Sequence, residues 1–203
     1  MDWVFLLKGI AIGFSIAAPV APIGVLCIRR SLESGLACGF MCGLGAATAD
    51  AVYGFIAGFG LTAVSVLLIN CQGWIGLAGG LFLCYLGLGI FKSTPPAESQ
   101  SKMEKGYIGP YFSTFFLTLL NPMTIVSFAA IFTGLGIAAG SSYTSAVALV
   151  VGVFSGSALW WLGLSSFVSL FRTSLSPGGM KRLNMLSGVI VFSLGVFTLN
   201  KAW

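Results

Sequence analysis

Long apolar stretches separated by short polar ones run along almost the whole chain. Each apolar stretch reaches the length of about 20 residues that a helix needs to cross a bilayer. The pattern therefore predicts six membrane helices, at residues 3–26, 36–61, 66–91, 111–138, 144–171 and 184–202. The expected fold class is an all-α integral membrane protein, with residues 1–203 forming a single membrane domain.

The composition supports a membrane protein and narrows its partners. Of the 203 residues, 57% are apolar and only 7% are charged, whereas a soluble domain carries roughly 25% charged residues. Mean hydropathy is +1.01. The net charge of +5 comes from basic residues at segment ends rather than in a stripe, so we expect the lipid bilayer as partner and no nucleic acid. The N-terminal residues lack the basic region of a signal peptide, and we expect the first apolar segment to be retained as a helix.

Two similar halves are separated by the one plainly polar linker, residues 92–106. Residues 1–91 and 107–203 then hold three helices each. Matching positions lie 107 or 108 residues apart, as in Gly45/Gly152, Ala49/Gly156, Asp50/Ser157, Tyr53/Trp160, Gly80/Gly188 and Gly87/Gly195. Because three is an odd number of crossings, the second half enters the membrane from the opposite side. The sequence thus predicts two inverted three-helix repeats, a recurrent plan of secondary transporters.

Basic residues concentrate in the first, third and fifth connections between the predicted helices. These connections hold Arg29, Arg30, Lys92, Lys102, Lys105, Arg172, Lys181 and Arg182. The other two connections carry no charge, and the opposite face has only Lys8 and Lys201. By the positive-inside rule, we expect a multi-pass protein of the plasma (inner) membrane with both termini outside and residues 92–106 in the cytoplasm. Arg29 and Arg30 either gate the cytoplasmic mouth or only set this topology.

Proline interrupts the first helix of each half. Pro19 and Pro22, followed by Gly24, fall in the first helix, and Asn121 and Pro122 fall in the fourth. Proline removes a backbone N–H and clashes with the preceding turn, while glycine adds backbone freedom. The carbonyl groups freed in this way are tolerated in a membrane only inside protein or along a water-filled cavity. Broken first and fourth helices therefore point to a binding site.

Asp50 is the only carboxylate inside a long apolar segment of this chain. A carboxylate at bilayer depth costs at least ~2.5–3.5 kcal/mol, which makes it a candidate functional residue. The alternative is a structural hydrogen bond to a neighbouring helix. Ser157 occupies the matching position of the second half, while Tyr53 and Trp160 lie one turn further along and either line a pocket or pack.

The depths of these residues predict one polar pocket near the middle of the membrane. At a rise of ~1.5 Å per residue, Asp50 lies roughly 18–20 Å into a core of about 30 Å. Asn121 and Pro19 fall at a similar central depth. Half-helix N-termini attract a carboxylate and the acid attracts an ammonium group, so an amino acid zwitterion fits the pocket. Asp50 could instead carry a proton, and the sequence leaves both roles open.

Small residues and cysteines are read mainly as packing residues. Glycines recur four residues apart, as at Gly35, Gly39 and Gly43, which favours close helix packing within the chain, with a homodimer contact as the alternative. The five cysteines include no Cys-x-x-Cys, and the chain has no histidine. We therefore expect no resident metal site and no cofactor.

The broken helices, the buried acid and the Asn-Pro pair resemble the lysine exporter family, which includes the lysine/arginine and homoserine/threonine exporters. The resemblance rests on Pro19-x-x-Pro22-x-Gly24 followed by Arg29 or Arg30, on Gly39, Gly43, Gly45 and Asp50, on Leu119-Leu120-Asn121-Pro122, and more weakly on Gly152, Trp160 and residues 182–188. Many members have Pro-Gly-Pro or Pro-x-Gly-Pro where this chain has Pro19-Val-Ala-Pro22. The resemblance implies export of amino acids or similar small solutes, driven by the proton gradient.

The leading hypothesis is a secondary transporter, not an enzyme, that exports an amino acid or related small amine. Its candidate substrate- or proton-binding residues are Pro19, Pro22, Gly24, Asp50, Tyr53, Asn121, Pro122, Ser157 and Trp160. One alternative is a metal cation exporter on the same scaffold, with Asp50, freed carbonyls and Cys38 or Cys42 as ligands. A less favoured alternative is a transmembrane redox carrier, because no cysteine lies in the second half.

Overall fold

The computed structural model describes residues 3–18, 21–59, 66–67, 69–92, 106–134, 143–171 and 177–201. Within these ranges the regular elements are all helices, which confirms the all-α prediction. They are α1 (Trp3–Ala17), α2 (Ala21–Ser34), α3 (Leu36–Gly58), α5 (Gln72–Phe91), α6 (Ile108–Leu119), α7 (Pro122–Gly134), α8 (Tyr143–Ser169) and α9 (Pro177–Lys201).

Between four and six segments are long and apolar enough to cross a membrane. Helices α3, α5 and α8, with residues Lys181–Lys201 of α9, meet this requirement singly. Two bent pairs add one span each if each pair crosses as a unit: α1 with α2, which meet at 83°, and α6 with α7, which meet at 60°. The interruptions expected in the first and fourth helices are therefore present, although Pro19 lies outside the described residues.

The first connection between spans is shorter than the sequence predicted. The first helix was expected to end near residue 26, but α2 continues through Arg29 and Arg30 to Ser34. Gly35, whose φ of 88° lies in the left-handed region that favours glycine, then turns the chain directly into α3. Placing the arginines in a loop was therefore wrong, because charge near a helix end does not end the helix, and Arg29 pairs with Glu33 one turn later.

Other helix boundaries differ by smaller amounts. Helix α9 begins at Pro177, ahead of the expected residue 184, and proline suits the first position of a helix. Helix α5 begins at Gln72 rather than near residue 66, because a turn at Cys71 separates it from the short helical residues before it. The polar linker at residues 93–105 lies outside the described residues.

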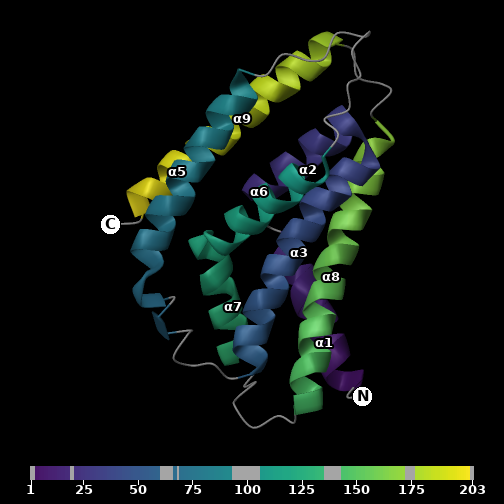
Figure 1. Cartoon of the computed structure of the whole chain (residues 1–203), viewed down its shortest axis with the longest axis vertical. Helices are drawn as coiled ribbons and strands as arrows, with labels where there is room; N and C mark the ends of the chain where they lie inside the picture. The colour runs from purple at the N-terminus through teal and green to yellow at the C-terminus, as the bar shows by residue number, and fades with distance from the viewer. Residues whose placement is uncertain are drawn as a thin grey trace.

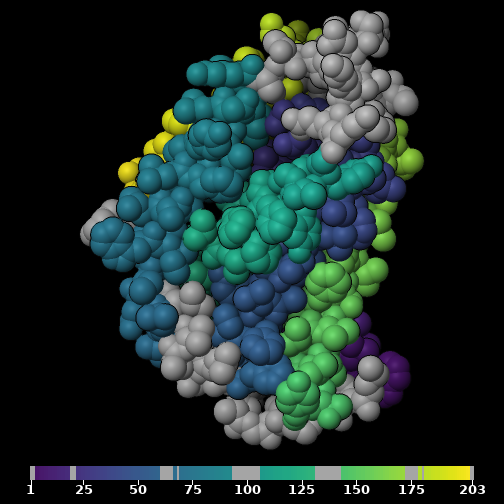
Figure 2. Space-filling model, in the orientation of Figure 1, coloured from purple at the N-terminus to yellow at the C-terminus, as the bar shows by residue number. Residues whose placement is uncertain are grey.

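The helices form two groups with the α6–α7 pair between them (Figure 1). Helix α8 packs against both α1 and α3, and α6 lies across α3. Helices α5 and α9 form a separate pair that runs side by side along the other flank (Figure 1). On the face drawn in Figure 2, α6 and α7 lie between α5 and α3. The α6–α7 pair thus occupies the middle of the molecule, with α1, α3 and α8 on one side and α5 and α9 on the other.

Glycine faces allow the closest helix approaches within each group. A Cβ atom added at Gly9 or Gly13 of α1 would meet backbone atoms of α8, and one added at Gly152 or Gly156 would meet backbone atoms of α1. The glycines that the sequence matched in α5 and α9 also meet the partner helix; they are Gly80, Gly87, Gly188 and Gly195. Such contacts suit a membrane, where packing holds helices together.

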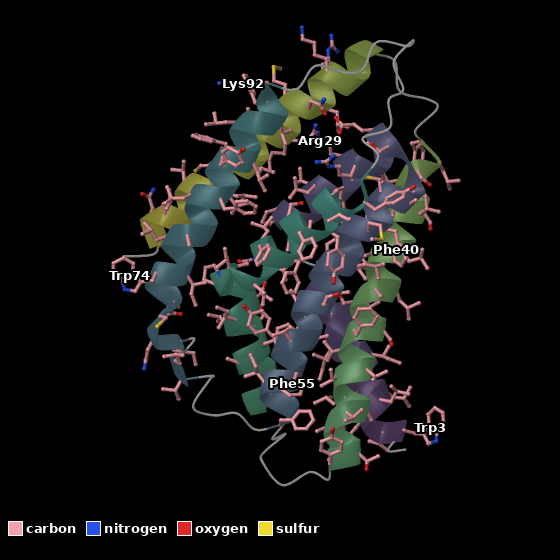
Figure 3. All side chains as sticks on the ribbon, viewed as in Figure 1. Trp3, Arg29, Phe40, Phe55, Trp74 and Lys92 are labelled. Carbon is pink, nitrogen blue, oxygen red and sulfur yellow. The ribbon has the colours of Figure 1, made fainter. Side chains whose placement is uncertain are left out.

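The outer surface of the described helices is strongly apolar. Exposed side chains include Trp3, Phe55 and Trp74, and in Figure 3 Trp3 and Trp74 point away from the bundle. Ala46, Ala47 and Ala49 of α3 are completely or almost completely buried, and so are larger side chains such as that of Trp161. An apolar exterior around a tightly packed interior is the arrangement expected for helices surrounded by lipid.

Candidate functional site

Asp50 is sealed between α3 and α8. Its side chain is 3% exposed, and its Oδ2 atom accepts a hydrogen bond of 2.7 Å from the hydroxyl of Ser157, which is fully buried. Gly43 and Gly54 of α3 face Trp161 and Val153 of α8, so the two helices approach closely around Asp50. The two positions that the sequence matched across the halves are therefore in direct contact.

Tyr53 connects the Asp50 region to the break between α6 and α7. Its hydroxyl donates a hydrogen bond of 2.6 Å to the carbonyl of Leu119, and its ring lies 5.4 Å from that of Phe128 in α7. In an unbroken helix the Leu119 carbonyl would accept from the N–H of Met123. That N–H donates to the Asn121 side chain instead, so Tyr53 satisfies the carbonyl that the break releases.

Asn121 caps the start of α7. Its Oδ1 atom accepts from the Met123 N–H at 3.1 Å, and its backbone carbonyl accepts from the Thr124 N–H at 3.0 Å. An asparagine in this position supplies an acceptor to the first turn, which otherwise has unpaired N–H groups. The Asn121 N–H in turn donates to the Thr118 carbonyl, whose usual partner would be the missing N–H of Pro122. The Thr118 and Leu119 carbonyls and the Met123 N–H, which the break separates from their usual helical partners, thus all have hydrogen bonds.

A cavity of about 680 Å³ lies where α7 faces α2, α5 and α9. Its wall includes Pro22 from one interrupted segment and Asn121 and Pro122 from the other. The remaining polar side chains around it are Asn70, Gln72, Thr124, Ser127, Thr198 and Lys201. No carboxylate is among the described residues that line the cavity. Its size is in the range of small-molecule sites.

The candidate residues fall into two groups in the structure. Pro22, Asn121 and Pro122 line the cavity, whereas Asp50, Tyr53 and Ser157 are not part of its lining and connect α3 to α8 and to α6. Gly24 is half-buried in α2, and a Cβ atom there would meet nothing within 4 Å. The ring of Trp160 packs edge-on against Phe14, with ring centres 5.1 Å apart.

Six polar residues at the cavity were absent from the predicted site, and two of them, Thr124 and Ser127, lie on α7 directly after Asn121. Thr124 is 2% exposed, and its hydroxyl has no hydrogen-bond partner in the part of the chain that the structure describes. Ser127 follows three residues later on the same face of α7. The spacing Asn121, Thr124, Ser127 in an otherwise apolar segment was the signal that could have found them.

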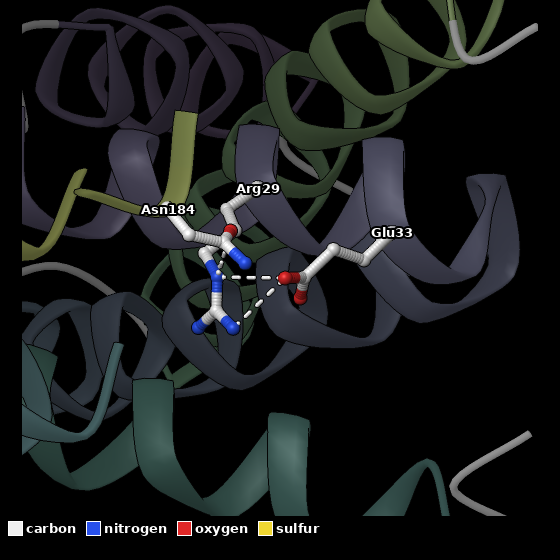
Figure 4. A network of polar contacts seen from close by, with 3 residues as sticks. All are labelled: Arg29, Glu33 and Asn184. Atoms are coloured by element: carbon white, nitrogen blue, oxygen red, sulfur yellow. Dashed lines mark hydrogen bonds and ion pairs between the residues drawn. The ribbon is translucent and has the colours of Figure 1, made fainter. Parts of the chain in front are cut away.

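A third polar group joins α2 to α9 (Figure 4). Arg29 Nε donates to Asn184 Oδ1 at 3.0 Å and to Glu33 Oε1 at 3.1 Å, and an Arg29 NH2 group lies 2.9 Å from the same Glu33 oxygen. Arg29 and Asn184 are 8% and 1% exposed. Asn184 precedes the cavity-lining residues of α9 by 10 to 17 positions, or about 15–26 Å along the helix. The cavity and this network thus lie near opposite ends of α9.

The thiol groups do not form a metal cluster with the acids in the described ranges. No three His, Cys, Asp or Glu side chains among those residues come together as metal ligands. The five cysteines form no disulfide; Cys27, Cys38 and Cys42 are buried, and Cys71 and Cys84 are partly exposed. The cavity lining is amide, hydroxyl, ammonium and apolar in character.

Comparison with known proteins identifies one matching family and two similar proteins. The family model described as "LysE type translocator" matches residues 14–201. The chain is 26% identical over 196 residues to "Putative amino acid efflux protein YcgF" of Bacillus subtilis (strain 168), which covers 94% of this chain and 93% of that protein. It is 29% identical over 181 residues to "Uncharacterized membrane protein YahN" of Escherichia coli (strain K12), covering 85% of this chain and 77% of that protein. No solved structure matches the chain significantly.

Proposed function

The chain belongs to the LysE type translocator family, and on this basis we propose that it exports an amino acid or related small amine from the cytoplasm, coupled to the proton gradient. The family match confirms the resemblance expected from the sequence motifs. The similar B. subtilis protein is named for amino acid efflux, which supports the same solute class here. Membership of a transporter family is consistent with the expectation that the chain is not an enzyme.

The observation that carries the proposal is the cavity at the meeting of both helix interruptions. Pro22 and Asn121–Pro122 come from opposite halves of the chain and line the same space. Discontinuous helices of this kind surround the substrate in several transporter folds. The amide and hydroxyl groups of the lining suit an amino acid, whereas a divalent cation usually takes several carboxylate, carbonyl or thiolate ligands.

Asp50 is assigned to the proton rather than to the solute. The carboxylate is closed off by Ser157 and by the small residues of α3, and it is not part of the cavity wall. A proton needs no cavity, only a group that can hold it and a hydrogen-bond partner. Tyr53 links this helix to the released carbonyl of Leu119, so a change at Asp50 has a direct route to the broken helices.

Two inverted repeats, residues 1–91 and 107–203 joined by the linker 92–106, are part of the same proposal. Both halves begin with a bent helix pair, α1–α2 and α6–α7. The helices that follow pair with their counterparts, α3 with α8 and α5 with α9. The Asp50–Ser157 hydrogen bond spans 107 residues, which is the offset of the sequence match. These relations support a pseudo-two-fold arrangement.

We further propose that the protein lies in the plasma (inner) membrane with both termini outside and residues 92–106 in the cytoplasm. Arg29 and Lys92 lie toward one end of the molecule, and Trp3 and Phe55 toward the other (Figure 3). With the basic end inside, the cavity extends from the helix breaks toward the outer side, since it reaches the last residues of α9. The Arg29 network then closes the cytoplasmic side.

Everted membrane vesicles test the proposed function. Vesicles from cells that contain the protein, and vesicles from cells that lack it, are energised to acidify the interior and given a labelled mixture of amino acids and small amines. Uptake of at least one solute that depends on the protein and collapses when an ionophore dissipates the pH difference supports proton-coupled export. No uptake above the vesicles without the protein would rule it out.

A further inference from the structure

We propose that the cavity selects solutes that carry a carboxylate and no net positive charge, so that neutral amino acids are carried while lysine, arginine and diamines are rejected. The inference rests on the proposed export function and adds the substrate class. The proposed selectivity follows from the charges around the cavity, from the N-terminus of α7 and from the Thr124 hydroxyl.

Lys201 is the charged side chain among the described residues that line the cavity. It extends from the last turn of α9, with its Nζ atom 4.8 Å from the centre of the Phe197 ring, which also lines the cavity. Asp50, the acid expected to attract a cation, is held by Ser157 outside the cavity wall. A second positive charge would therefore enter beside Lys201 without a carboxylate to pair with it.

The start of α7 supplies the attractive part of the site. Pro122, Met123 and Thr124, the first residues of this 13-residue helix, all line the cavity. The N-terminus of a helix carries a partial positive charge and favours a carboxylate. Asn121 uses its amide oxygen to cap the helix, which leaves its NH2 group as a further donor at the same place.

Thr124 provides an independent indication of a ligand. It lines the cavity and is 2% exposed, yet its hydroxyl has no partner within the described ranges. Buried polar groups are nearly always hydrogen-bonded, so an unpaired one at a cavity calls for an explanation. In the proposed complex the Thr124 side chain rotates about its χ1 angle, so that its hydroxyl turns toward the cavity and donates to a carboxylate bound at the start of α7.

The rest of the lining fits the other parts of a neutral amino acid. Ser127 and Thr198 offer hydroxyl oxygens that can accept from an ammonium group. Ile16, Val126 and Leu194 supply apolar surface for a side chain. The site thus holds one carboxylate and one ammonium group with neutral net charge, while a basic side chain adds a charge that none of the described lining residues compensates.

Competition among solutes tests the selectivity. Everted vesicles receive all twenty amino acids and putrescine at equal concentration, and their contents are quantified by mass spectrometry. We expect at least one neutral amino acid to exceed lysine, arginine and putrescine about tenfold, which corresponds to ~1.4 kcal/mol. Accumulation of lysine, arginine or putrescine to the same or a higher level overturns the inference but leaves the export function intact. Accumulation of no solute overturns the export function itself.

Lys201→Met tests the repulsive charge. Lys181 lies near the other end of α9, is exposed and is outside the cavity lining, so Lys181→Met is its matched control. Lys201→Met should raise lysine uptake relative to neutral amino acids about threefold or more, and the control should leave the ratio unchanged. An unchanged ratio in Lys201→Met, or an equal change in both variants, overturns the role of Lys201.

Thr124→Val tests the carboxylate site, with Thr144→Val on the exposed surface of α8 as control. The purified proteins are titrated with the best-transported amino acid and with the amine that lacks its carboxylate, and their unfolding temperatures are compared. We expect about a tenfold loss of amino acid affinity in Thr124→Val, no loss of stability, and no binding of the amine by the unchanged protein. If Thr124→Val only raises the unfolding temperature, or if the amine binds as well as the amino acid, the carboxylate site is refuted.

Discussion

The Asp50–Ser157 contact and the cavity are both polar regions within apolar helices, but they are built in opposite ways. The first consists of two side chains that are 3% and 0% exposed and joined by a 2.7 Å hydrogen bond. The second is a space of about 680 Å³ lined by several uncharged polar groups and Lys201. Asp50 thus lies in a closed contact that cannot hold a solute. The cavity, which can hold one, has no carboxylate among its described lining residues.

Under the proposed function, this difference assigns the proton and the solute to separate regions of the chain. A proton is held by a single group in a closed contact, and an amino acid needs an open space with several donors and acceptors. Tyr53 lies between the two regions, with its hydroxyl on the Leu119 carbonyl and its ring against Phe128. Variants in each region should therefore affect different steps of transport, and the predictions below run from the largest expected effect to the smallest.

Asp50→Asn should have the largest effect on transport. The amide cannot take up and release a proton as a carboxylate does, so proton-driven uptake should fall to the level of vesicles without the protein. Solute binding in the cavity should remain within about twofold, because Asp50 does not line it. Uptake in everted vesicles and titration of the purified variant measure the two effects. A parallel loss of binding would show that the two regions are one site.

Asn121→Ala should give the opposite pattern. Loss of the cap removes the acceptor of the Met123 N–H and lowers helix stability by about 1 kcal/mol. Solute affinity should fall several-fold, because the first residues of α7 line the cavity. Asp50 is unchanged in this variant, so saturating solute should still cause proton release. Asn121→Ser, which retains a capping side chain, should recover the stability. Titration calorimetry and unfolding temperature provide the measurements, and unchanged affinity in the alanine variant would contradict the assignment.

Tyr53→Phe should weaken both functions moderately. It leaves the partly buried Leu119 carbonyl without its donor, which costs about 1 kcal/mol. Because Tyr53 contacts the break from the helix that holds Asp50, we expect smaller, simultaneous decreases in affinity and in coupled uptake. Tyr143→Phe, on the exposed start of α8, is the control. An effect on one function alone would place Tyr53 in one region rather than between the two.

Ser157→Ala should produce the smallest change. The variant removes one buried hydrogen bond to Asp50, with a contribution of about 0.5–3 kcal/mol depending on the charge of the acid. The carboxylate itself remains, so coupled uptake should be slower but present, and affinity for the solute should not change. Ser157→Thr, which keeps the hydroxyl, should be closer to the unchanged protein. Complete loss of uptake in Ser157→Ala would mean that the serine is itself essential to proton movement.

Much of the fold followed from local features of the sequence. Pro22 and Pro122 predicted where the first and fourth helices are interrupted, because a residue without an N–H changes the ladder wherever it occurs. The glycines at 80, 87, 188 and 195, which the sequence matched between the two halves, lie where α5 and α9 pack closely, although the sequence did not predict that these two helices are partners. Arg29 was misplaced in a loop, since the topology rule counts charge at helix ends and says nothing about whether the helix continues.

The candidate site was harder to derive from the sequence. Depth along the membrane normal placed Asp50 and Asn121 at a similar level, but depth is one coordinate and does not say which way a side chain faces. Asp50 faces α8, and Asn121 faces the space next to α5 and α9. Thr124 was overlooked because a single threonine in an apolar helix commonly bonds to its own backbone, and only the tertiary structure shows that this one does not.

The distance along the chain between Asp50 and Ser157 also sets an order of assembly. At about 5–20 residues per second of synthesis, α3 precedes its partner residue by roughly 5–20 s. Helix α1 likewise packs its Gly9 and Gly13 face against α8, which is made late. During that interval the insertion machinery or neighbouring helices must cover Asp50 and the glycine face of α1 in place of α8. The first half therefore completes its packing only when α8 arrives.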